Sequence, residues 1–555
     1  MFLIKRNLSA VIILCFILFV SLFLRLYDLN NIPLGFHIDE ASLGYNGYSL
    51  SLTGRDENNN TLPLYVDMFG DNRPSGYHYL TIVPINIFGL NEFSTRFPSA
   101  FLGALIFIPF FFLTQILFKN KKISLIASLL ISIAPWSVVL SRASAETVVA
   151  IFFIILGYSL LIFGIQNKQG KYFLPSSLVM SISFFLYHTP RVFVPLLFLA
   201  SLIFLYPIWG RFTKKLKLNL LLSFFLLSII SFSLVFIVRG GTGRFSQVNI
   251  FGYPEVRLVM EEQIREDGVT HTPAFISRVF HNKPINYSLG FMANYFEYFS
   301  GKFLFFEGGL PNWYRVPAMG LIYLVELPFI LIGIYYLFKS KDKYSKLPII
   351  WLFIAPVTAA ITVDDIPNIQ RAIVMFPMLE LIAAYGLFSF AERFSDYKLK
   401  YKFVLLFFGI LLTLNMFYFL HQYFVQSQVH KNWYRYEGFN QMMDVVKKDY
   451  SSYNKIVISK SFGGIYPLVL FYMKFDPSIY QKEGSPKDKD DTGFGKFFFV
   501  PSACPSVDKD PKVPKVERII FIDNGTCPNY DNLKYYKHSY IYRKDGSKAF
   551  RIVYE

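Results

Sequence analysis

Long apolar runs alternate with short polar segments along most of this chain. The first unbroken run covers residues 8–24, and ten similar runs follow it. They lie at about 98–118, 123–140, 147–165, 172–187, 192–209, 218–238, 316–338, 347–363, 371–391 and 403–420. A helix needs roughly 17–25 apolar residues to span a bilayer, so the pattern predicts about eleven transmembrane helices. The predicted fold class is therefore an α-helical polytopic membrane protein.

The loops between these runs differ in charge. Lys and Arg cluster in every second short loop, and short basic loops stay on the cytoplasmic side of a membrane. This alternation predicts a cytoplasmic N-terminus and an extracytoplasmic C-terminus. The clusters lie at positions 5–6, 119–122, 168–171, 211–217, 339–346 and 393–402.

Composition supports the same interpretation. The chain is 53% hydrophobic and only 17% charged, whereas a soluble protein carries about 25% charged residues. The net charge of +17 by itself is typical of a nucleic-acid-binding protein. Because the positive charge is confined to short loops between apolar runs, we expect it to fix membrane topology, and we expect no nucleic-acid partner.

Three regions are predicted to face outward: the loops 28–94 and 239–315, and the tail. Segment 40–52 in the first loop has the apolar spacing of a helix, and we expect it to lie along the membrane interface. The tail is different in character. It has a helical pattern at 438–449, β-prone segments at 455–460, 496–500 and 518–523, and an Asp-Gly turn typical of a hairpin near its end. We therefore predict a transmembrane domain over 1–421 and a small extracytoplasmic α/β domain over 422–555.

The three cysteines are too few for a disulfide scaffold or a metal cluster. Cys15 lies in the first apolar run and is expected to be an inert apolar residue. Cys504 and Cys527 lie in the outer tail, where the compartment permits a disulfide. We expect these two to be paired.

The first outer loop holds the densest group of reactive side chains. Asp39 and Glu40 follow the first apolar run closely and have apolar residues on both sides. A carboxylate near a low-dielectric boundary has its pKa raised toward values useful for a general base. The alternative is that this acidic pair serves as the N-terminal cap of a helix.

A family resemblance rests on this loop and on later segments. The stretch PLGFHIDEASLGYNGYSLSLTGRDENNNTLPLYV resembles the first outer loop of the family 39 and 83 glycosyltransferases, a group that includes protein O-mannosyltransferases and the aminoarabinose transferases of lipid A. The segments DNRPSGYHYL, NEFSTRFPSAFLGAL, SRASAETVVAIFF, YHTPRVFVPLL and PNIQRAIVMFPML are also similar to bacterial members of this group. The resemblance covers about residues 8–425 and implies the GT-C membrane fold.

The chemistry that this resemblance implies is transfer of a sugar from a polyprenyl phosphate to an acceptor. Asp39 matches the family's catalytic acidic position, with Glu40 as its partner. Glu146 matches a second carboxylate, although many members have Asp there. The implied enzyme is a hexosyl- or pentosyltransferase, inverting at the anomeric centre, in a bacterial plasma membrane. Its partners would be a polyprenyl-phosphate-linked sugar, membrane lipid, and a glycan, lipid or protein acceptor; a divalent metal is left open.

Cations are needed to stabilise the departing lipid phosphate. Arginine suits this task because its planar guanidinium binds phosphate oxygens in a bidentate manner. The candidates share a position in outer loops or at outer helix ends, and the alternative for each is a contact with lipid headgroups. They are Arg73, Arg142, His188, Arg191, Arg239, Arg244 and Arg371.

Two further functions stay open. A polymerase or ligase of surface polysaccharide also uses lipid-linked sugars. A transporter of lipid-linked precursors is favoured by Glu326 and Glu380, two carboxyls inside predicted spans, because intramembrane charges are often functional. A structural hydrogen bond between helices explains these two residues more simply.

Overall fold

The computed structural model describes residues 8–238, 241, 248–252, 254–394, 396–461, 463–483, 493–508, 513 and 516–555. These residues form two compact units. The first unit comprises 1–25, 102–141 and 145–419, and the second comprises 26–101, 142–144 and 420–555. The first outer loop thus belongs to the same unit as the tail, although the sequence had grouped it with the membrane-spanning part. The division at residue 421 remains a prediction.

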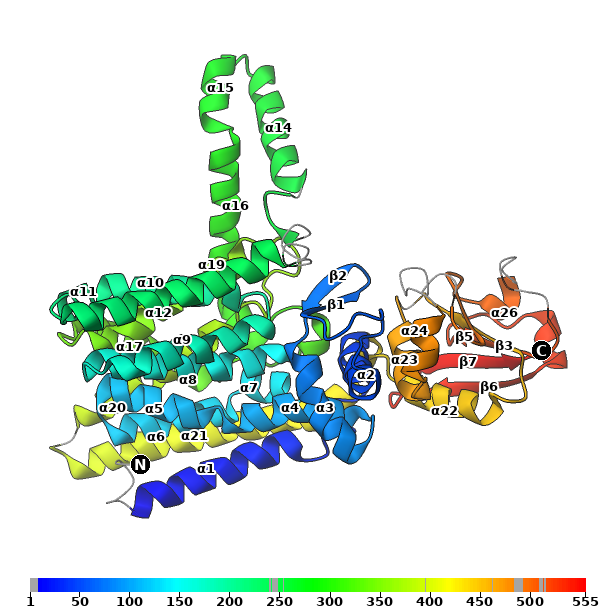
Figure 1. The fold of residues 1–555 in the computed structure, drawn as a ribbon, viewed down its shortest axis with the longest axis horizontal. Coiled ribbons are helices and arrows are strands. Elements are labelled where there is room, and N and C mark those ends of the chain that lie inside the picture. Colours follow the sequence, from blue (N-terminus) through cyan, green and yellow to red (C-terminus); the bar gives the residue numbers. More distant parts are fainter. Residues whose placement is uncertain are drawn as a thin grey trace. The chain divides into compact units, whose positions relative to one another are not determined.

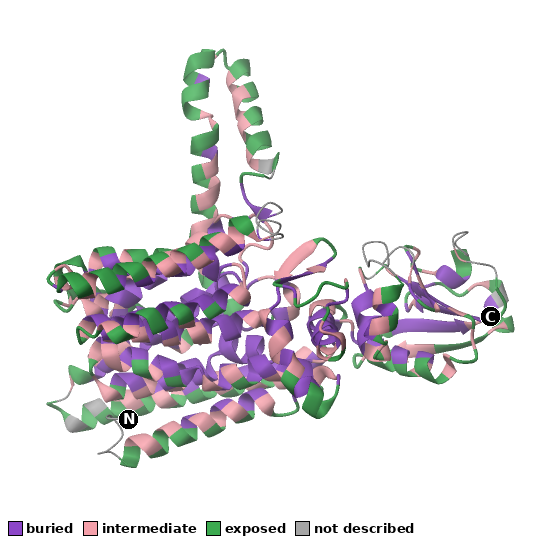
Figure 2. Cartoon of the chain, viewed as in Figure 1, coloured by how far each residue is buried: buried purple, intermediate pink, exposed green. Residues whose placement is uncertain are grey.

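The first unit is a bundle of apolar helices (Figure 1). Buried positions fill the interior of the bundle, while its outer surface is exposed and apolar (Figure 2). Its helices are α1 (Leu8–Leu26), α5 (Phe107–Phe118), α6 (Lys121–Ile133), α7 (Pro135–Ser141), α8 (Glu146–Gln166), α9 (Phe173–Ile182), α10 (Pro190–Phe204), α11 (Tyr206–Trp209), α12 (Lys214–Phe232), α14 (Pro254–Val269), α15 (Ala274–Phe280), α16 (Lys283–Glu297), α17 (Leu327–Lys339), α18 (Leu347–Ile354), α19 (Val357–Ala360), α20 (Phe376–Glu392) and α21 (Lys398–Phe424).

Within the described residues, six helices are long and apolar enough to cross a membrane, or seven if the bent pair α6 and α7 is one span. These seven coincide with predicted apolar runs. The runs at 192–209 and 347–363 form shorter apolar helices, over Pro190–Phe204 and Tyr344–Ala360. The chain is therefore an integral membrane protein, as predicted, while the exact number of spans remains a prediction.

One predicted span has a different start. We predicted a helix over 316–338, but α17 begins at Leu327, after a short 3-10 turn at Leu324–Glu326. The backbone before it is non-helical and makes its hydrogen bonds elsewhere: Leu321 and Ile322 donate to Leu304 O, and Leu321 O accepts from Trp136 N. Non-helical backbone at membrane depth is tolerated where protein satisfies it, which hydropathy alone does not reveal.

The second unit contains a mixed five-stranded sheet in the order β4-β3-β5-β7-β6. Strands β4, β3 and β5 are parallel, whereas β7 is antiparallel to both β5 and β6. The predicted small α/β domain and its C-terminal hairpin are confirmed. The elements of this unit are α2 (Ile38–Thr53), β1 (Tyr65–Met68), β2 (Asp71–Pro74), α3 (Gly76–Phe88), α22 (Phe439–Asp449), β3 (Lys455–Ser459), α23 (Tyr466–Met473), α24 (Pro477–Lys482), β4 (Phe497–Val500), α26 (Pro505–Asp508), β5 (Ile519–Asn524), β6 (Lys537–Tyr542) and β7 (Lys548–Tyr554), with most of α4 (Glu92–Leu105).

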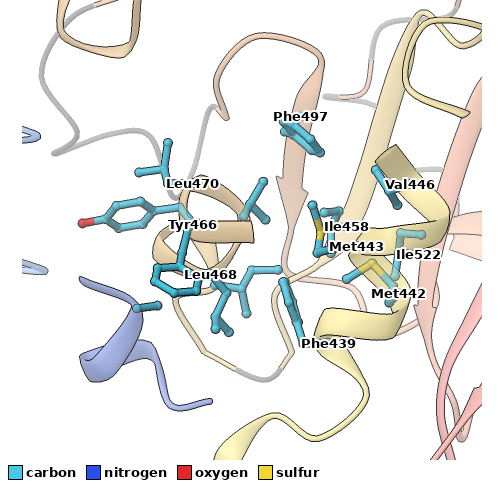
Figure 3. Close-up of a cluster of buried hydrophobic side chains, with 14 of the residues drawn as sticks. Phe439, Met442, Met443, Val446, Ile458, Tyr466, Leu468, Leu470, Phe497 and Ile522 are labelled. Carbon is cyan, nitrogen blue, oxygen red and sulfur yellow. The ribbon is translucent and has the colours of Figure 1, made fainter. Parts of the chain in front are cut away.

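The core of this unit lies between one face of the sheet and two helices. Side chains of α22, such as Phe439 and Met443, meet Ile458 and Ile522 of the sheet (Figure 3). The same cluster includes Phe36, Ala41 and Tyr45 from the first loop, and the ring centroids of Phe36 and Phe471 lie 4.6 Å apart. Helix α2 was expected to lie along the membrane interface. The helix is present, but it is buried against α3 and α23 because its apolar positions belong to this shared core.

A disulfide joins Cys504 to Cys527. Beside it, Arg551 and Asp523 form a fully buried ion pair with an Nη2–Oδ2 distance of 2.7 Å. Asp523 also accepts hydrogen bonds from the backbone and hydroxyl of Ser506. The disulfide and the ion pair therefore tie the segment after β4 to β5 and β7.

Replacing both Cys504 and Cys527 with Ser is expected to lower the stability of the second unit. The disulfide spans 23 positions, and closing such a loop is worth about 3 kcal/mol on the chain-entropy model. Thermal unfolding in detergent measures the change, and Cys15→Ser is the matched control that should not change the midpoint. Peptide mapping that finds both thiols free in freshly isolated wild-type protein would contradict this assignment.

Candidate active site

The site is built around the first turn of α2. His37 is the N-cap: its Nδ1 accepts a hydrogen bond from Asp39 N at 3.2 Å, while Glu40 Oε2 accepts one from His37 N at 3.3 Å. This reciprocal arrangement is a capping box, with histidine in the position that serine or threonine usually takes. Capping is therefore done by His37 and Glu40, and the side chain of Asp39 is free of that task.

Glu40 is the centre of a buried network. Its side chain is only 4% exposed. Arg96 Nε donates to its Oε1 at 3.0 Å, Ser144 Oγ donates to the same oxygen at 3.1 Å, and Arg435 Nη2 donates to its Oε2. One carboxylate thus holds together residues from the first loop, α4, the 142–144 loop and the tail. A buried charge with two guanidiniums and further hydrogen bonds is well compensated.

Arg96 extends this network to the backbone that leads into α2. Its guanidinium also donates to Leu29 O at 3.0 Å and to Gly35 O at 2.8 Å. Gly35 has φ +79°, and a Cβ there would lie 2.4 Å from Arg435 O. Only glycine fits this close approach in the left-handed region. The path of the chain from Leu29 to Asp39 is therefore fixed by contacts within the second unit.

Asp39 lies on the more open side of this turn. Arg73 Nη1 is 3.1 Å from Asp39 Oδ1, and Arg73 Nε is 3.2 Å from Asp71 Oδ2. Arg73 sits in β2, whose pairing with β1 places it opposite Val66. The side chains of Asp39 and Arg73 are 23% and 25% exposed. The structure thus brings together one predicted base and one predicted phosphate ligand.

The pKa of Asp39 differs from the expectation. Burial raises the pKa of this carboxyl, but the positive charge of Arg73 and the polar interactions with Arg73 and His37 outweigh burial and hold the pKa well below its usual range. The prediction of a raised pKa was wrong, because the sequence shows the apolar neighbours but not the cation that folds back onto the carboxylate. The pKa of Glu40 is also lowered, since Arg96 and Arg435 overcome the effect of burial.

Two aromatic neighbours complete the surroundings. The ring of Tyr436 lies 5.8 Å from that of His37. His78, in α3, is buried, and burial together with the charge of Arg73 lowers its pKa to about 3. His78 is therefore neutral at physiological pH. Neither residue was singled out in the sequence, because nothing local marks them.

Two of the other predicted phosphate ligands have structural partners. Arg142 is fully buried, donates to Tyr27 O and Ile32 O, and lies over the ring of Phe424 at 5.0 Å. Arg191 is buried too, and it donates to Phe184 O at 2.9 and 2.7 Å. Both side chains hold backbone turns in place.

The remaining candidates lie in the first unit or outside the described residues. Arg371 donates to Thr362 Oγ1 at 2.8 Å and pairs with Asp364 at 3.2 Å. His188 Nδ1 lies 3.1 Å from Arg191 Nη1. Glu146 is the first residue of α8, where a carboxylate interacts favourably with the helix dipole. Arg239 and Arg244 lie outside the described residues.

Among the described residues, no group of three or more His, Cys, Asp or Glu side chains is placed to hold a metal ion. Sequence reasoning did not identify Arg96 and Arg435, the two arginines that bind the carboxylate of Glu40. Arg96 stands in the NEFSTRFPSA segment that carries part of the family resemblance, which is a usable signal. Arg435 lies 395 positions from Glu40, and no pattern in the sequence links them.

Comparison with known proteins agrees with this architecture. Residues 72–236 match the family described as dolichyl-phosphate-mannose-protein mannosyltransferase. This segment includes Arg73, Arg96 and Ser144 but is less than half of the chain. Among curated protein sequences, none matches.

Solved structures share the fold at low sequence identity. The ArnT protein from Cupriavidus metallidurans, solved with undecaprenyl phosphate, is 11% identical, with 98% of this chain and 97% of that chain covered and a TM-score of 0.55. The oligosaccharyltransferase from Archaeoglobus fulgidus, solved with zinc and sulfate, is 15% identical, with 97% and 72% covered and a TM-score of 0.53. In another structure of that enzyme, with a tethered acceptor peptide, this chain spans 63% of its length. The chain thus has the fold of the GT-C glycosyltransferases, as predicted.

Replacing Glu40 with Gln is expected to destabilise the protein strongly. The change leaves Arg96 and Arg435 without their buried counter-charge, and breaking a buried ion pair in this way costs about 3–5 kcal/mol. Unfolding in detergent measures the loss. The control is Glu261→Gln on α14, which removes an exposed i,i+4 pair with Arg257 worth about 0.5 kcal/mol. Equal, small effects of the two substitutions would rule out the anchoring role of Glu40.

Proposed function

We propose that this protein is an integral membrane glycosyltransferase that moves a sugar from a polyprenyl-phosphate donor to an acceptor on the outer face of the membrane. The donor is a single hexosyl or pentosyl unit on the lipid phosphate, and the acceptor is a glycan, a lipid or a protein. The GT-C fold, the match over 72–236 and the ArnT structure with undecaprenyl phosphate support this assignment. The basic loops support a cytoplasmic N-terminus, and the resemblance to bacterial members of the family supports a bacterial plasma membrane location.

The observation that carries the proposal is the Asp39–Arg73 pair. Sugar transfer from a lipid phosphate needs a general base that takes the proton of the attacking hydroxyl. It also needs a cation that stabilises the negative charge of the departing phosphate. Here a partly exposed carboxylate and a partly exposed guanidinium lie within 3.1 Å of each other. In contrast, the buried Glu40 serves as the anchor of the turn, and burial of Arg142 and Arg191 counts against their contact with a ligand.

In this proposal Arg73 interacts first with Asp39 and then with the donor phosphate, and this exchange couples donor binding to catalysis. Before the donor binds, Arg73 lowers the pKa of Asp39 and makes it a weak proton acceptor. When the donor phosphate binds the guanidinium, the positive charge moves away from Asp39 and the pKa of Asp39 rises. Asp39 is then a stronger base at the step in which it takes the proton of the acceptor hydroxyl. The hydroxyl then attacks the anomeric carbon from the face opposite the phosphate, and a single displacement inverts that centre.

The competing functions differ in what they do to the donor. A transferase releases one polyprenyl phosphate for each sugar moved, a ligase or polymerase moves a longer glycan, and a transporter leaves the donor intact. The buried carboxyls Glu326 and Glu380 favour the transporter, but Glu380 accepts a hydrogen bond from Trp136 Nε1 at 3.3 Å and so has a structural neighbour. Incubation of purified protein with synthetic polyprenyl-phosphate sugars separates these outcomes, and an intact donor in the presence of acceptor extract would refute the enzyme assignment.

Asp39→Asn is expected to lower turnover by about 10²–10⁴-fold, the usual contribution of a general base. The substitution keeps the shape of the side chain, and because His37 and Glu40 cap α2, stability should change by about 1 kcal/mol or less. Turnover and unfolding midpoint are measured together. Asp67→Asn, in β1 of the same unit, is the matched control that should leave turnover unchanged. A well-folded, fully active Asp39→Asn enzyme would exclude Asp39 as the base.

Arg73→Met is expected to slow transfer and to move the acid limb of the pH profile of kcat/KM, which reports the free enzyme, in which Arg73 still pairs with Asp39. Loss of a charge-assisted contact worth roughly 1.5–3 kcal/mol lowers the rate about ten- to a hundred-fold. Because burial of Asp39 then acts without the opposing cation, its pKa rises, and activity is lost at a pH higher by about 1–3 units than in the wild type. Arg73→Lys should recover only part of the rate. An unchanged acid limb in Arg73→Met would show that Asp39 is not the titrating base.

A further inference from the structure

The hairpin α14–α16 of the first unit exposes several large apolar side chains although its helices are not among those long and apolar enough to span a membrane. Its helices run across the direction of α10 and α12, away from the bundle (Figure 1). Nearly all of its residues are exposed or half-buried (Figure 2). Phe275 is 80% exposed and Phe280 is 63% exposed. Exposed apolar side chains gathered in this way mark a surface that binds a membrane or another molecule.

Helix α16 has two distinct faces. Ile285, Leu289, Met292 and Phe296 are all exposed, and their spacing of four, three and four residues places them on one stripe. The other face, with Asn286, Gly290 and Asn294, lines a pocket of about 450 Å³ together with Val256 and Val259 of α14 and Val363, and Leu289 of the stripe also contributes to its lining. The hairpin's own packing therefore uses mainly the second face: Ile285, Met292 and Phe296 do not line the pocket, and Leu289 is still 62% exposed.

The root of the hairpin is attached to the membrane-embedded part of the chain. Asn294 Nδ2 donates to Ala360 O at 3.2 Å and to Thr362 O at 3.1 Å. These residues lie at the end of the apolar helical segment Tyr344–Ala360. Ile250 N also donates to Ile361 O. A hairpin that leaves the end of such a segment and runs across the spans lies parallel to the membrane plane at the level of the headgroups.

The distribution of charged residues in the hairpin is also typical of the headgroup region of a membrane. From Gly268 to Phe296 the chain has no acidic residue but contains Arg278 and Lys283. The acidic residues of the hairpin lie in α14 and at the last position of α16, Glu297, and Asp267 of α14 pairs with His281 at 3.2 Å. Exposed aromatic and aliphatic residues beside basic ones are typical of interfacial helices that bind anionic lipid.

We propose that α15 and α16 lie in the bilayer interface, with Phe275, Phe280 and the Ile285–Phe296 stripe among the acyl chains and with Arg278 and Lys283 at the lipid phosphates. The occupant of this surface is thus the membrane itself. Such a hairpin fixes the depth of the adjoining bundle end relative to the headgroups. The proposal concerns lipid contact alone and holds whether or not the protein transfers sugar.

Site-directed spin labelling in vesicles of phosphatidylethanolamine and phosphatidylglycerol tests the proposal. On a Cys15→Ser background, in which the remaining cysteines are disulfide-bonded, labels are placed by Phe275→Cys, Phe280→Cys and Leu289→Cys. Glu262→Cys on the charged side of α14 is the control. We expect the first three labels to collide frequently with oxygen and rarely with a water-soluble nickel chelate, and the control to show the reverse.

Three results would overturn the proposal. Equal access of the nickel chelate to all four sites would place the hairpin in water. Spectral broadening that disappears on dilution with unlabelled protein would show that a second copy covers the stripe. The double variant Arg278→Gln, Lys283→Gln should make Phe275→Cys labels more accessible to the chelate in anionic vesicles but not in neutral ones, and an equal change in both would exclude the lipid phosphate contact.

Discussion

One buried carboxylate, Glu40, constrains the candidate site. It accepts hydrogen bonds from Arg96, Arg435 and Ser144 in a position with almost no solvent access. Such a group is stable only as long as all its partners are present, because each unpaired buried charge costs several kcal/mol. The network therefore acts as a single unit, and it fixes the first turn of α2 relative to the tail.

The proposed chemistry depends on Asp39, the acidic residue of this turn that does not cap the helix. With His37 and Glu40 capping the helix, Asp39 is turned to the more open side and meets Arg73 from β2. Adjacent acidic residues thus have different environments: Glu40 is fixed and buried, while Asp39 is partly exposed and shares a cation that a phosphate can compete for. This division of tasks is the physical basis of the proposed transferase mechanism.

The sequence predicted those parts of the molecule that depend on local patterns. Apolar runs predicted the membrane helices, β-prone segments and an Asp-Gly turn predicted the strands of the tail, and the loop motifs predicted the GT-C fold. Local sequence patterns could not predict contacts between residues that lie far apart in the chain. Arg435 reaches Glu40 across 395 positions, and Arg73 lowers the pKa of Asp39 through a fold-back of the chain that hydropathy does not encode. The non-helical backbone before α17 was missed for a related reason, because its hydrogen bonds go to Leu304 and Trp136.

A double-mutant cycle between Glu40 and Arg435 tests the central claim that the buried network joins the first loop to the tail. Glu40→Gln, Arg435→Met and the double variant are compared by denaturant unfolding in mixed micelles. The account predicts that the double variant loses less stability than the sum of the two single changes, with a coupling of about 1–3 kcal/mol. Additive losses, within about 0.5 kcal/mol, would show that the two residues act independently and would contradict the account.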